Sequence, residues 1–456
     1  MPLQLLRRSL LVGLGLWLWA SPLGAQDFAR PAAKQAYEAG VAALKNKQAA
    51  AAQAQLEQAL ALEPNHKAVL WELGWAFWLQ QNWPQVLVHW QALAQQDPHY
   101  KELPQYLPLA QDYAKLGQKT QDWTPNTPSP SPEGVIQLTA VGDLMMGSDF
   151  EGPDQLPPFK GTQIFDPVTE FLTGDLVFAN LEGPLTQVPD SQKCKGKEKC
   201  WAFRTPPAYV NNLKKAGFNI VNLANNHILD FGLPGLRETQ KTLTSAGIAH
   251  FGPLGQPSTT LVIKGKRIAF LGTAVVSCCL HVDQIHLVSD RVKELKATHD
   301  WVIVSMHAGA EGSDAGHVPP GPELYRGESR GDVRAFAHAV VDAGADLVIG
   351  HGPHALRALE HYQGKVIAYS LGNFLGYSGF SILGNLRYTL ILQLDFNLNA
   401  QVQRLKVIPL VMKPFALPTP DPQARTWAML NQLGKADFPR SAILLDQNGE
   451  WRPSLQ

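Results

Sequence analysis

The sequence lacks several features that would place the protein in a familiar class. Lys plus Arg and Asp plus Glu number 39 each, so no excess charge attracts the chain to nucleic acid, and we expect no nucleic-acid partner. The four cysteines contain no CxxC pair, which gives no support to a zinc site of that type. No GxGxxG follows the first predicted strand, which disfavours a dinucleotide-binding dehydrogenase. With 456 residues the chain is too long for one hydrophobic core, which predicts two or three units.

The N-terminus has the three regions of a secretory signal peptide. Arg7 and Arg8 precede an apolar run over residues 10–20, and Leu23-Gly24-Ala25 follows as a cleavage site. The run is shorter than the roughly 20 apolar residues that span a bilayer. We therefore expect residues 1–25 to be removed and the mature protein to be periplasmic or extracellular. Membrane attachment through an uncleaved N-terminus is the alternative. Because the two arginines are adjacent, export by the Sec route and by the twin-arginine route both remain open.

Export changes what the cysteines are expected to do. Cys194 and Cys200 flank the lysine-rich loop KCKGKEKC, and an oxidising compartment favours a disulfide across it. Cys278 and Cys279 follow a strand-like run, so we expect them to pack as buried apolar residues. The sequence does not choose among the three pairings that four cysteines allow.

Residues 30–118 have a helical pattern, rich in Ala, Leu and Gln, with proline where helices should end. Three pairs of similar residues recur at a spacing of 34: Gly40 and Gly74 (74 − 40), Pro64 and Pro98 (98 − 64), and Tyr37 and Trp71 (71 − 37). This is the tetratricopeptide period, in which each repeat needs a neighbour to cover its apolar face. A plain helical bundle is the alternative. Either would be a binding or spacer module, and the partner that we expect is an envelope protein.

A linker rich in Pro and Ser, residues 119–134, precedes a different pattern. In residues 135–415 short β-branched or apolar runs alternate with helical stretches, which predicts an α/β domain with buried strands. The runs 388–396 and 402–411 partly alternate and should pair antiparallel. Residues 416–456 are weakly patterned and form a C-terminal extension to which we assign no role.

Polar residues gather where six of the predicted strands end. They are Asp143 after 135–141, Asn180 and Glu182 after 176–179, Asn225, Asn226, His227 and Asp230 after 220–223, His307 and Glu311 after 301–305, His351 and His354 after 347–350, and Asn373 after 366–369. Ligands of open α/β sheets bind outside the carboxyl ends of the strands, so we expect these clusters to meet in one crevice. Carboxylate, amide and imidazole donors together suit a divalent ion such as Mn, Fe or Zn better than calcium.

The blocks that carry these residues resemble those of the CapA family. They are GDLMMG, FANLEGPLT, NLANNHILDFG, HAGAEG, VIGHGPHALRALE and YSLGNF, in this order, over residues 135–410. That family is related to the calcineurin-like metallophosphoesterases and is tied to the synthesis of poly-γ-glutamate or other capsule polymers. The resemblance implies a metallophosphoesterase-like sandwich of two sheets flanked by helices, preceded here by the small all-α domain.

The resemblance also implies roles for individual residues. Asp143 would bind a metal ion and Glu182 would bridge two. Asn226, His307 and His351 would complete the ligands of one ion, and His354 would serve the other. His227 would face the substrate, with Asp230 fixing its tautomer. The remaining candidates, Asn180, Asn225, Glu311 and Asn373, would bind substrate or support the loops.

This sequence departs from the phosphoesterase pattern at the first ion. The D-x-H element is missing, because Leu144 and Met145 follow Asp143, and Glu182 stands where the phosphoesterases have Asp. One ion and two ions therefore both remain open. Four arginines are candidates for binding an anionic substrate, although surface ion pairing is the simpler expectation for each: Arg204, Arg326, Arg330 and Arg357.

Three functions follow from these expectations. The first is an exported CapA-like protein that participates in the synthesis, export or attachment of a capsule polymer, with an anionic polymer or a phosphate-containing compound as substrate. The second is a metal-dependent phosphoesterase acting on an extracytoplasmic phosphate ester, which the missing D-x-H element disfavours. The third is a non-catalytic polymer-binding scaffold, which the complete set of candidate ligands disfavours.

Overall fold

The computed structural model describes residues 28–46, 48–80, 82–116, 122–123, 131–150, 155–191, 193–194 and 200–453. The predicted signal peptide, residues 1–25, and most of the predicted linker lie outside these described residues. Two compact units are present, one ending at Lys119 and one beginning at Thr120. None of the helices in the described ranges is both long enough and apolar enough to cross a membrane.

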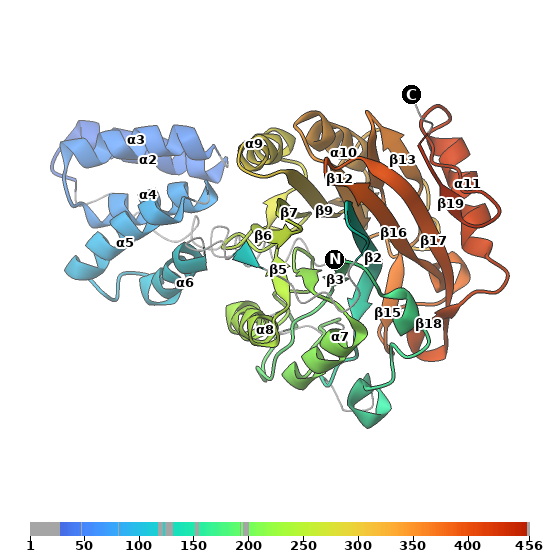
Figure 1. Cartoon of the computed structure of the whole chain (residues 1–456). Helices are drawn as coiled ribbons and strands as arrows, with labels where there is room; N and C mark the ends of the chain where they lie inside the picture. Colours follow the sequence, from blue (N-terminus) through green and yellow to red (C-terminus); the bar gives the residue numbers. More distant parts are fainter. Residues whose placement is uncertain are drawn as a thin grey trace. The chain divides into compact units, whose positions relative to one another are not determined.

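In the described part of the N-terminal unit the regular elements are helices (Figure 1). Its helices are α2 (Pro31–Lys45), α3 (Ala49–Leu62), α4 (Lys67–Leu79), α5 (Trp83–Gln96) and α6 (Leu103–Leu116). The two repeat glycines make equivalent contacts, since a Cβ on Gly40 would lie 2.5 Å from Leu56 Cγ and one on Gly74 would lie 1.8 Å from Trp90 Nε1. Both partners follow their glycine by the same number of residues (56 − 40 = 90 − 74 = 16). The 34-residue repeat of the sequence is therefore also a repeat of helix packing.

The first sheet of the C-terminal unit has the strand order β1-β6-β7-β9-β12-β14-β13, with β8 beside β7. Its strands are β1 (Asp122–Trp123), β6 (Ser258–Ile263), β7 (Lys266–Ala274), β8 (Leu280–His281), β9 (Trp301–His307), β12 (Leu347–His351), β13 (Leu359–Tyr362) and β14 (Lys365–Ala368). The central strands β7, β9, β12 and β14 run parallel. Both of their faces are covered, which explains their nearly continuous apolar sequences.

The second sheet has the order β18-β17-β16-β2-β3-β4-β5, with β15 beside β2 and β19 beside β17. Its strands are β2 (Val135–Met145), β3 (Leu176–Leu181), β4 (Ile220–Asn222), β5 (Ala249–Phe251), β15 (Asn373–Gly376), β16 (Tyr388–Asn397), β17 (Val402–Lys413), β18 (Leu417–Pro420) and β19 (Glu450–Trp451). Strands β2 to β5 are parallel neighbours. Strands β16 and β17 pair antiparallel, which confirms the prediction for runs 388–396 and 402–411.

The core lies between the two sheets. Leu138 and Phe178 of the second sheet pack against Phe270 and Ile303 of the first in one buried cluster. The helices of this unit are α7 (Val210–Ala216), α8 (Gly232–Ala246), α9 (Ile285–Lys296), α10 (Val333–Asp342) and α11 (Arg425–Asp437), with a short hairpin of β10 (Leu324–Tyr325) and β11 (Glu328–Ser329). Helices α9 and α10 cover the outer face of the first sheet with a second apolar cluster (Figure 1). This two-sheet α/β sandwich flanked by helices confirms the predicted fold class.

Local sequence sets where several of these helices begin and end. The Asp332 side chain accepts a hydrogen bond from the Ala335 N–H at 2.9 Å, which caps the start of α10. Helices α7 and α8 end at Gly217 and Gly247, whose φ angles of +98° and +76° are easily adopted by glycine alone.

The last forty residues, to which the sequence assigned no role, belong to the core of this unit. Strands β18 and β19 both pair with β17, and Leu430 of α11 and Ile443 are buried in the cluster between the sheets. Their elements are short and joined by turns, so no long periodic pattern marks them in the sequence.

Candidate metal centre

The candidate site lies where the two sheets meet. Strand β2 carries Asp143, and Glu182 directly follows β3, so both come from the second sheet. His307 and His351 are the last residues of the neighbouring strands β9 and β12 in the first sheet, where they stand in register. Asp143 lies inside β2 rather than after it, because β2 extends to Met145 and pairs there with β3 and β15. Four of the six polar clusters thus converge from two different sheets.

Asp143, Glu182 and His307 bring their ligand atoms together. One atom from each residue lies within 4.8 Å of the other two, and all three residues are buried. His307 Nδ1 is 3.9 Å from Asp143 Oδ1, and His307 Nε2 is 3.8 Å from Glu182 Oε1. His354 adds a further donor, with Nδ1 3.2 Å from Asp143 Oδ2 and Nε2 3.8 Å from Glu182 Oε1. One ion binds only one nitrogen of an imidazole ring, so a common ion would take a single atom from each of Asp143, Glu182 and His307, and such a set of three atoms lies within 4.8 Å.

Several polar atoms of this group have no hydrogen-bond partner within the described residues. They are Oε1 and Oε2 of Glu182, Nε2 of His307, Nδ1 of His351 and Oδ1 of Asn226. Glu182 is 0 % exposed, so water does not compensate its charge. A buried carboxylate without a partner costs several kcal/mol. A cation bound between Glu182 and His307 would satisfy the unpartnered atoms of both residues.

Burial and the neighbouring charges also shift the pKa values of these residues. Burial raises the pKa of Glu182 well above its usual value, and the negative charge of Asp143 raises it further. Burial would also raise the pKa of Asp143, but His354, His307 and His351 outweigh it and hold that pKa below its usual value. Burial lowers the pKa of His307 to about 3, which keeps this imidazole neutral and able to bind a metal.

His354 has the opposite shift. Burial alone would lower its pKa, but the carboxylates of Glu182 and Asp143 raise it well above the usual value. Without a metal ion, a protonated His354 therefore supplies the positive charge that the two carboxylates need. Binding of an ion would displace that proton, because only a neutral imidazole is a ligand.

The turn that carries His354 is strained. Its φ of +60° is left-handed, which is uncommon for a residue other than glycine. Gly352, with φ +107°, donates its N–H to Asp143 Oδ2 at 3.4 Å, and a Cβ there would meet the Ala308 nitrogen at 3.0 Å. Asn373 Oδ1 lies 2.8 Å from His354 Nδ1 and holds the ring in place. The left-handed conformation of His354 thus places its imidazole next to Asp143.

Asparagine side chains support the centre from the second sheet. Asn180 donates from Nδ2 to Asp143 Oδ1 at 2.8 Å and accepts at Oδ1 from Asn225 at 3.2 Å. Asn225 in turn donates to the Leu181 carbonyl at 2.8 Å and accepts the His227 N–H at 3.1 Å. Both amides are therefore occupied in orienting Asp143 and the loop that carries Asn226 and His227.

His227 and Asp230 form a pair beside this loop. His227 Nδ1 lies 2.8 Å from Asp230 Oδ2, and both residues are buried. Burial and the nearby Lys193 ammonium lower the pKa of His227, so the imidazole is neutral near pH 7. Asp230 stays charged, because Lys193 and His227 outweigh the effect of burial and lower its pKa. With Nδ1 occupied by these neighbours, Nε2 is the nitrogen left to exchange a proton with a substrate.

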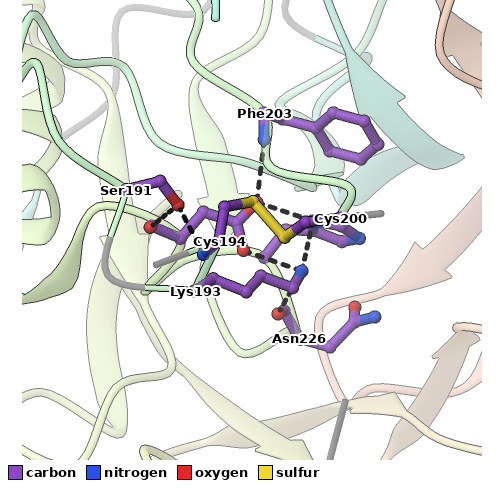
Figure 2. Close-up of a disulfide and its surroundings, with 8 residues drawn as sticks. Ser191, Lys193, Cys194, Cys200, Phe203 and Asn226 are labelled. Carbon is purple, nitrogen blue, oxygen red and sulfur yellow. Dashed lines mark hydrogen bonds and ion pairs between the residues drawn. A yellow bond between two sulfur atoms is a disulfide. The ribbon is translucent and has the colours of Figure 1, made fainter. Parts of the chain in front are cut away.

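Lys193 is a residue of this site that the sequence did not reveal. Its Nζ is 2.8 Å from Asp230 Oδ1 and 3.5 Å from the Asn226 carbonyl oxygen (Figure 2). In the sequence, the loop KCKGKEKC is notable only for its cysteines. Cys194 and Cys200 form a disulfide, as predicted. No spacing rule assigns one lysine of such a loop to a site formed by residues more than thirty positions away. Cys278 and Cys279 are free and buried, which also agrees with expectation.

Buried arginine pairs hold the loop that carries Glu311. Arg330 Nη1 lies 2.9 Å from Glu311 Oε1, and Arg330 is 3 % exposed. Arg357, at 0 % exposed, binds Glu323 with two hydrogen bonds of 2.7 and 2.6 Å. The expectation of surface ion pairing was therefore wrong for Arg330 and Arg357, because the loop over residues 309–311 and its neighbours cover them.

The other two arginines lie nearer the surface. Arg204 pairs with Asp149 at 2.6 Å, and both side chains are partly exposed. Arg326 is exposed, and its guanidinium lies over the ring of Tyr325. Neither residue is brought to the group around Asp143 by the contacts described above.

Residues 137–378 match a protein family described as bacterial capsule synthesis protein PGA_cap. The match covers more than half of the 456 residues. The chain belongs to this family. The matched segment contains every candidate site residue from Asp143 to Asn373, so the resemblance found in the sequence blocks and the family match rest on the same strands and loops.

Two relatives carry capsule-related names. The chain is 29 % identical over 262 residues to the capsule biosynthesis protein CapA of Bacillus anthracis, covering 53 % of this chain and 59 % of the relative. It is 30 % identical over 264 residues to the PGA biosynthesis protein CapA of Bacillus subtilis, covering 53 % and 64 %. This chain thus spans about three fifths of the length of these relatives. Among solved structures, a 5'-nucleotidase precursor of Thermus thermophilus overlaps 66 % of this chain and 59 % of its own, with 15 % identity and a TM-score of 0.35, which is too weak to inform activity.

Proposed function

We propose that the group around Asp143 and Glu182 binds a divalent transition-metal ion. The observation that carries this proposal is the Glu182 carboxylate, which is 0 % exposed and has no hydrogen-bond partner for either oxygen among the described residues. Asp143 and Glu182 would hold the ion, Asn226, His307 and His351 would complete its ligands, and His354 would serve a second ion. Mixed oxygen and nitrogen donors suit Mn, Fe or Zn. One ion is the minimum, because the missing D-x-H element removes one ligand from the two-ion pattern of the phosphoesterases.

The ion would polarise a phosphoryl or carbonyl oxygen and make water a better nucleophile. The residues of the chain orient the ligands and move protons. Asn180 fixes the orientation of Asp143 through its 2.8 Å hydrogen bond. His227 is neutral and oriented by Asp230, so its Nε2 accepts a proton from water or returns one to a leaving group.

We further propose that the protein is exported and participates in the synthesis, export or attachment of a capsule polymer of the poly-γ-glutamate type. Its membership of the capsule synthesis family supports this proposal. An anionic polymer or a phosphate-containing compound is the proposed substrate, since a cationic centre attracts such groups. The signal-peptide pattern of residues 1–25 and the Cys194–Cys200 disulfide support a periplasmic or extracellular location at the cell envelope.

The helical unit has a proposed role of its own. Its repeated helix pairs, related by 34 residues, support a tetratricopeptide-like module. Such modules present an extended surface formed by stacked repeats, which suits binding of another protein. We therefore propose that this unit binds an envelope protein.

A metal-dependent phosphoesterase is the second candidate. The observation that favours it is the His227–Asp230 pair beside the centre, because a polymer-binding scaffold has no need of an oriented, buried imidazole. Under this alternative the substrate is an extracytoplasmic phosphate ester.

Deletion of the gene distinguishes these functions when it is combined with metal analysis. Loss or altered chain length of the extracellular polymer, restored by the wild-type gene but not by a His307→Ala variant, supports the capsule function with a metal centre. Unchanged polymer with altered turnover of phosphate esters supports the phosphoesterase. Metal content near zero after purification without chelator and reloading with Mn, Fe or Zn would contradict both and leave the scaffold.

A further inference from the structure

Residues on both sides of the Cys194–Cys200 disulfide contact the His227–Asp230 pair. Lys193, directly before Cys194, has a side chain only 9 % exposed, with Nζ 2.8 Å from Asp230 Oδ1 and 3.0 Å from His227 Nδ1. Phe203, just after Cys200, donates its N–H to Asp230 Oδ2 at 2.8 Å. Its ring stacks on the His227 imidazole at 4.2 Å between centroids. Figure 2 shows Lys193 and Phe203 on opposite sides of the disulfide.

The start of this segment is also anchored to the backbone of Asp230. Ser191 Oγ donates to the Asp230 carbonyl oxygen at 2.8 Å and accepts the Cys194 N–H at 3.2 Å. The Lys193 N–H donates to the same carbonyl at 3.4 Å. The sulfur–sulfur bond then ties this anchor to the chain that leads to Phe203. Two stretches of chain, one ending at Cys194 and one beginning at Cys200, therefore hold the His227–Asp230 pair, and the disulfide joins them.

Lys193 needs this anchoring because its position is costly. A lysine side chain loses much rotamer freedom when it is buried, and its ammonium must find an acceptor for each of three donors. Two acceptors lie within reach, namely Asp230 Oδ1 at 2.8 Å and the Asn226 carbonyl oxygen at 3.5 Å, while His227 Nδ1, whose own proton goes to Asp230 Oδ2, lies 3.0 Å away. The disulfide restricts the chain directly next to Lys193 in the unfolded and the folded protein, so less freedom remains to be lost when the ammonium reaches these acceptors.

We propose that residues 193–194 and 200–203, joined by the Cys194–Cys200 disulfide, form a clamp that positions His227, and that Lys193 is the positioning residue through which the clamp acts. The reactivity of His227 rests on the proposed function, whereas the clamp itself concerns geometry alone. Opening the disulfide takes two electrons and two protons from a dithiol, which becomes a disulfide while Cys194 and Cys200 become thiols. The clamp then loosens, and the orientation of His227 depends on the redox state of its surroundings.

The test compares four variants with the wild type. Cys194→Ser/Cys200→Ser removes the bond, Lys193→Gln removes the cation with the bond intact, and Lys193→Arg is the conservative replacement. Lys365→Gln is the matched control, because Lys365 also forms a partly buried ion pair, with Asp346 at 2.7 Å, on β14. The measurements are the ¹⁵N and ¹H signals of the His227 ring, hydrogen exchange at the Phe203 amide, metal content, and hydrolysis of bis(p-nitrophenyl) phosphate.

We expect the Lys193→Gln and double-serine variants to retain metal but to shift the His227 signals. Their kcat should fall by about tenfold or more with little change in KM, since a misoriented acid–base group slows chemistry more than binding. Lys193→Arg should restore part of kcat, exchange at Phe203 should accelerate in the double-serine variant, and Lys365→Gln should match the wild type. Should the double-serine variant not fold, dithiol treatment of the folded wild type replaces it.

Unchanged His227 signals and unchanged kcat in both Lys193→Gln and the disulfide-free protein would overturn the clamp. A wild type without bound metal and without hydrolysis would contradict the proposed function instead. In that case the His227 signals and the Phe203 exchange still decide the clamp, because neither depends on turnover.

Discussion

Replacing Glu182 by Gln should have opposite effects on stability with and without metal. Neither oxygen of Glu182 has a hydrogen-bond partner in the described part of the chain, and burial raises its pKa well above the usual 4.5. In the metal-free protein the folded state therefore holds this proton more tightly than the unfolded state does. Its stability then decreases as the pH rises above about 4.5. Gln has the same shape without the charge, so metal-free Glu182→Gln should be at least as stable as the metal-free wild type near neutral pH.

Bound metal should instead make the wild type more stable than Glu182→Gln. An ion present at 100 times its Kd stabilises the folded state by about 2.7 kcal/mol. One kcal/mol shifts the Tm of a domain of this size by about 2 °C, so metal should raise the wild-type Tm by about 5 °C. The variant keeps Asp143 and the imidazoles but lacks the carboxylate placed next to them. Its metal-induced shift should be less than about half as large.

Differential scanning calorimetry with and without Mn, Fe or Zn measures both effects. Glu360→Gln is the matched control, because Glu360 is also a buried glutamate but has hydrogen-bond partners in His338, Tyr369 and Ser441. That control should lose stability in both conditions and keep the full metal-induced shift. An equal metal-induced shift in Glu182→Gln and wild type, or a large loss of stability in the metal-free variant, would refute the metal centre.

Three further predictions concern other parts of the chain. Gly74→Ala should destabilise the helical unit by about 1–3 kcal/mol, because its Cβ would lie 1.8 Å from Trp90 Nε1 and this outweighs the gain in helix propensity. Gly40→Ala should lower the stability of the helical unit by less, because the flexible Leu56 side chain can move. Equal Tm values in tryptophan-monitored melts of the two variants would contradict this packing. Burial lowers the pKa of His250 to about 4, so the free energy of unfolding should fall by up to about 3 kcal/mol as the pH drops from about 6.5 to 4. Denaturant titrations should show a smaller fall in His250→Gln. N-terminal sequencing of exported protein should find Gln26 first, and an uncleaved cytosolic chain would contradict export.

Much of the fold could be predicted because it depends on local patterns. The buried strands of 135–415 and the antiparallel pair β16 and β17 follow from the period of apolar residues along the chain, and the 34-residue repeat follows from recurring glycine, proline and aromatic residues. The C-terminal residues from β18 onward could not be predicted in this way. Leu430 and Ile443 become core residues only because β17 offers an edge and a face to cover.

The sequence by itself determined which side chains are available for the candidate site, because the polar blocks follow apolar strand patterns that are visible without a structure. It did not determine that Asp143 and Glu182 come from one sheet while His307 and His351 come from the other. Nor did it show that Lys193 reaches Asp230. Contacts between residues far apart in sequence depend on strand order, register and loop closure, which arise from packing of the whole domain. The buried Glu182 carboxyl group without a hydrogen-bond partner, the strongest indication of a metal ion, arises only after that packing has excluded water.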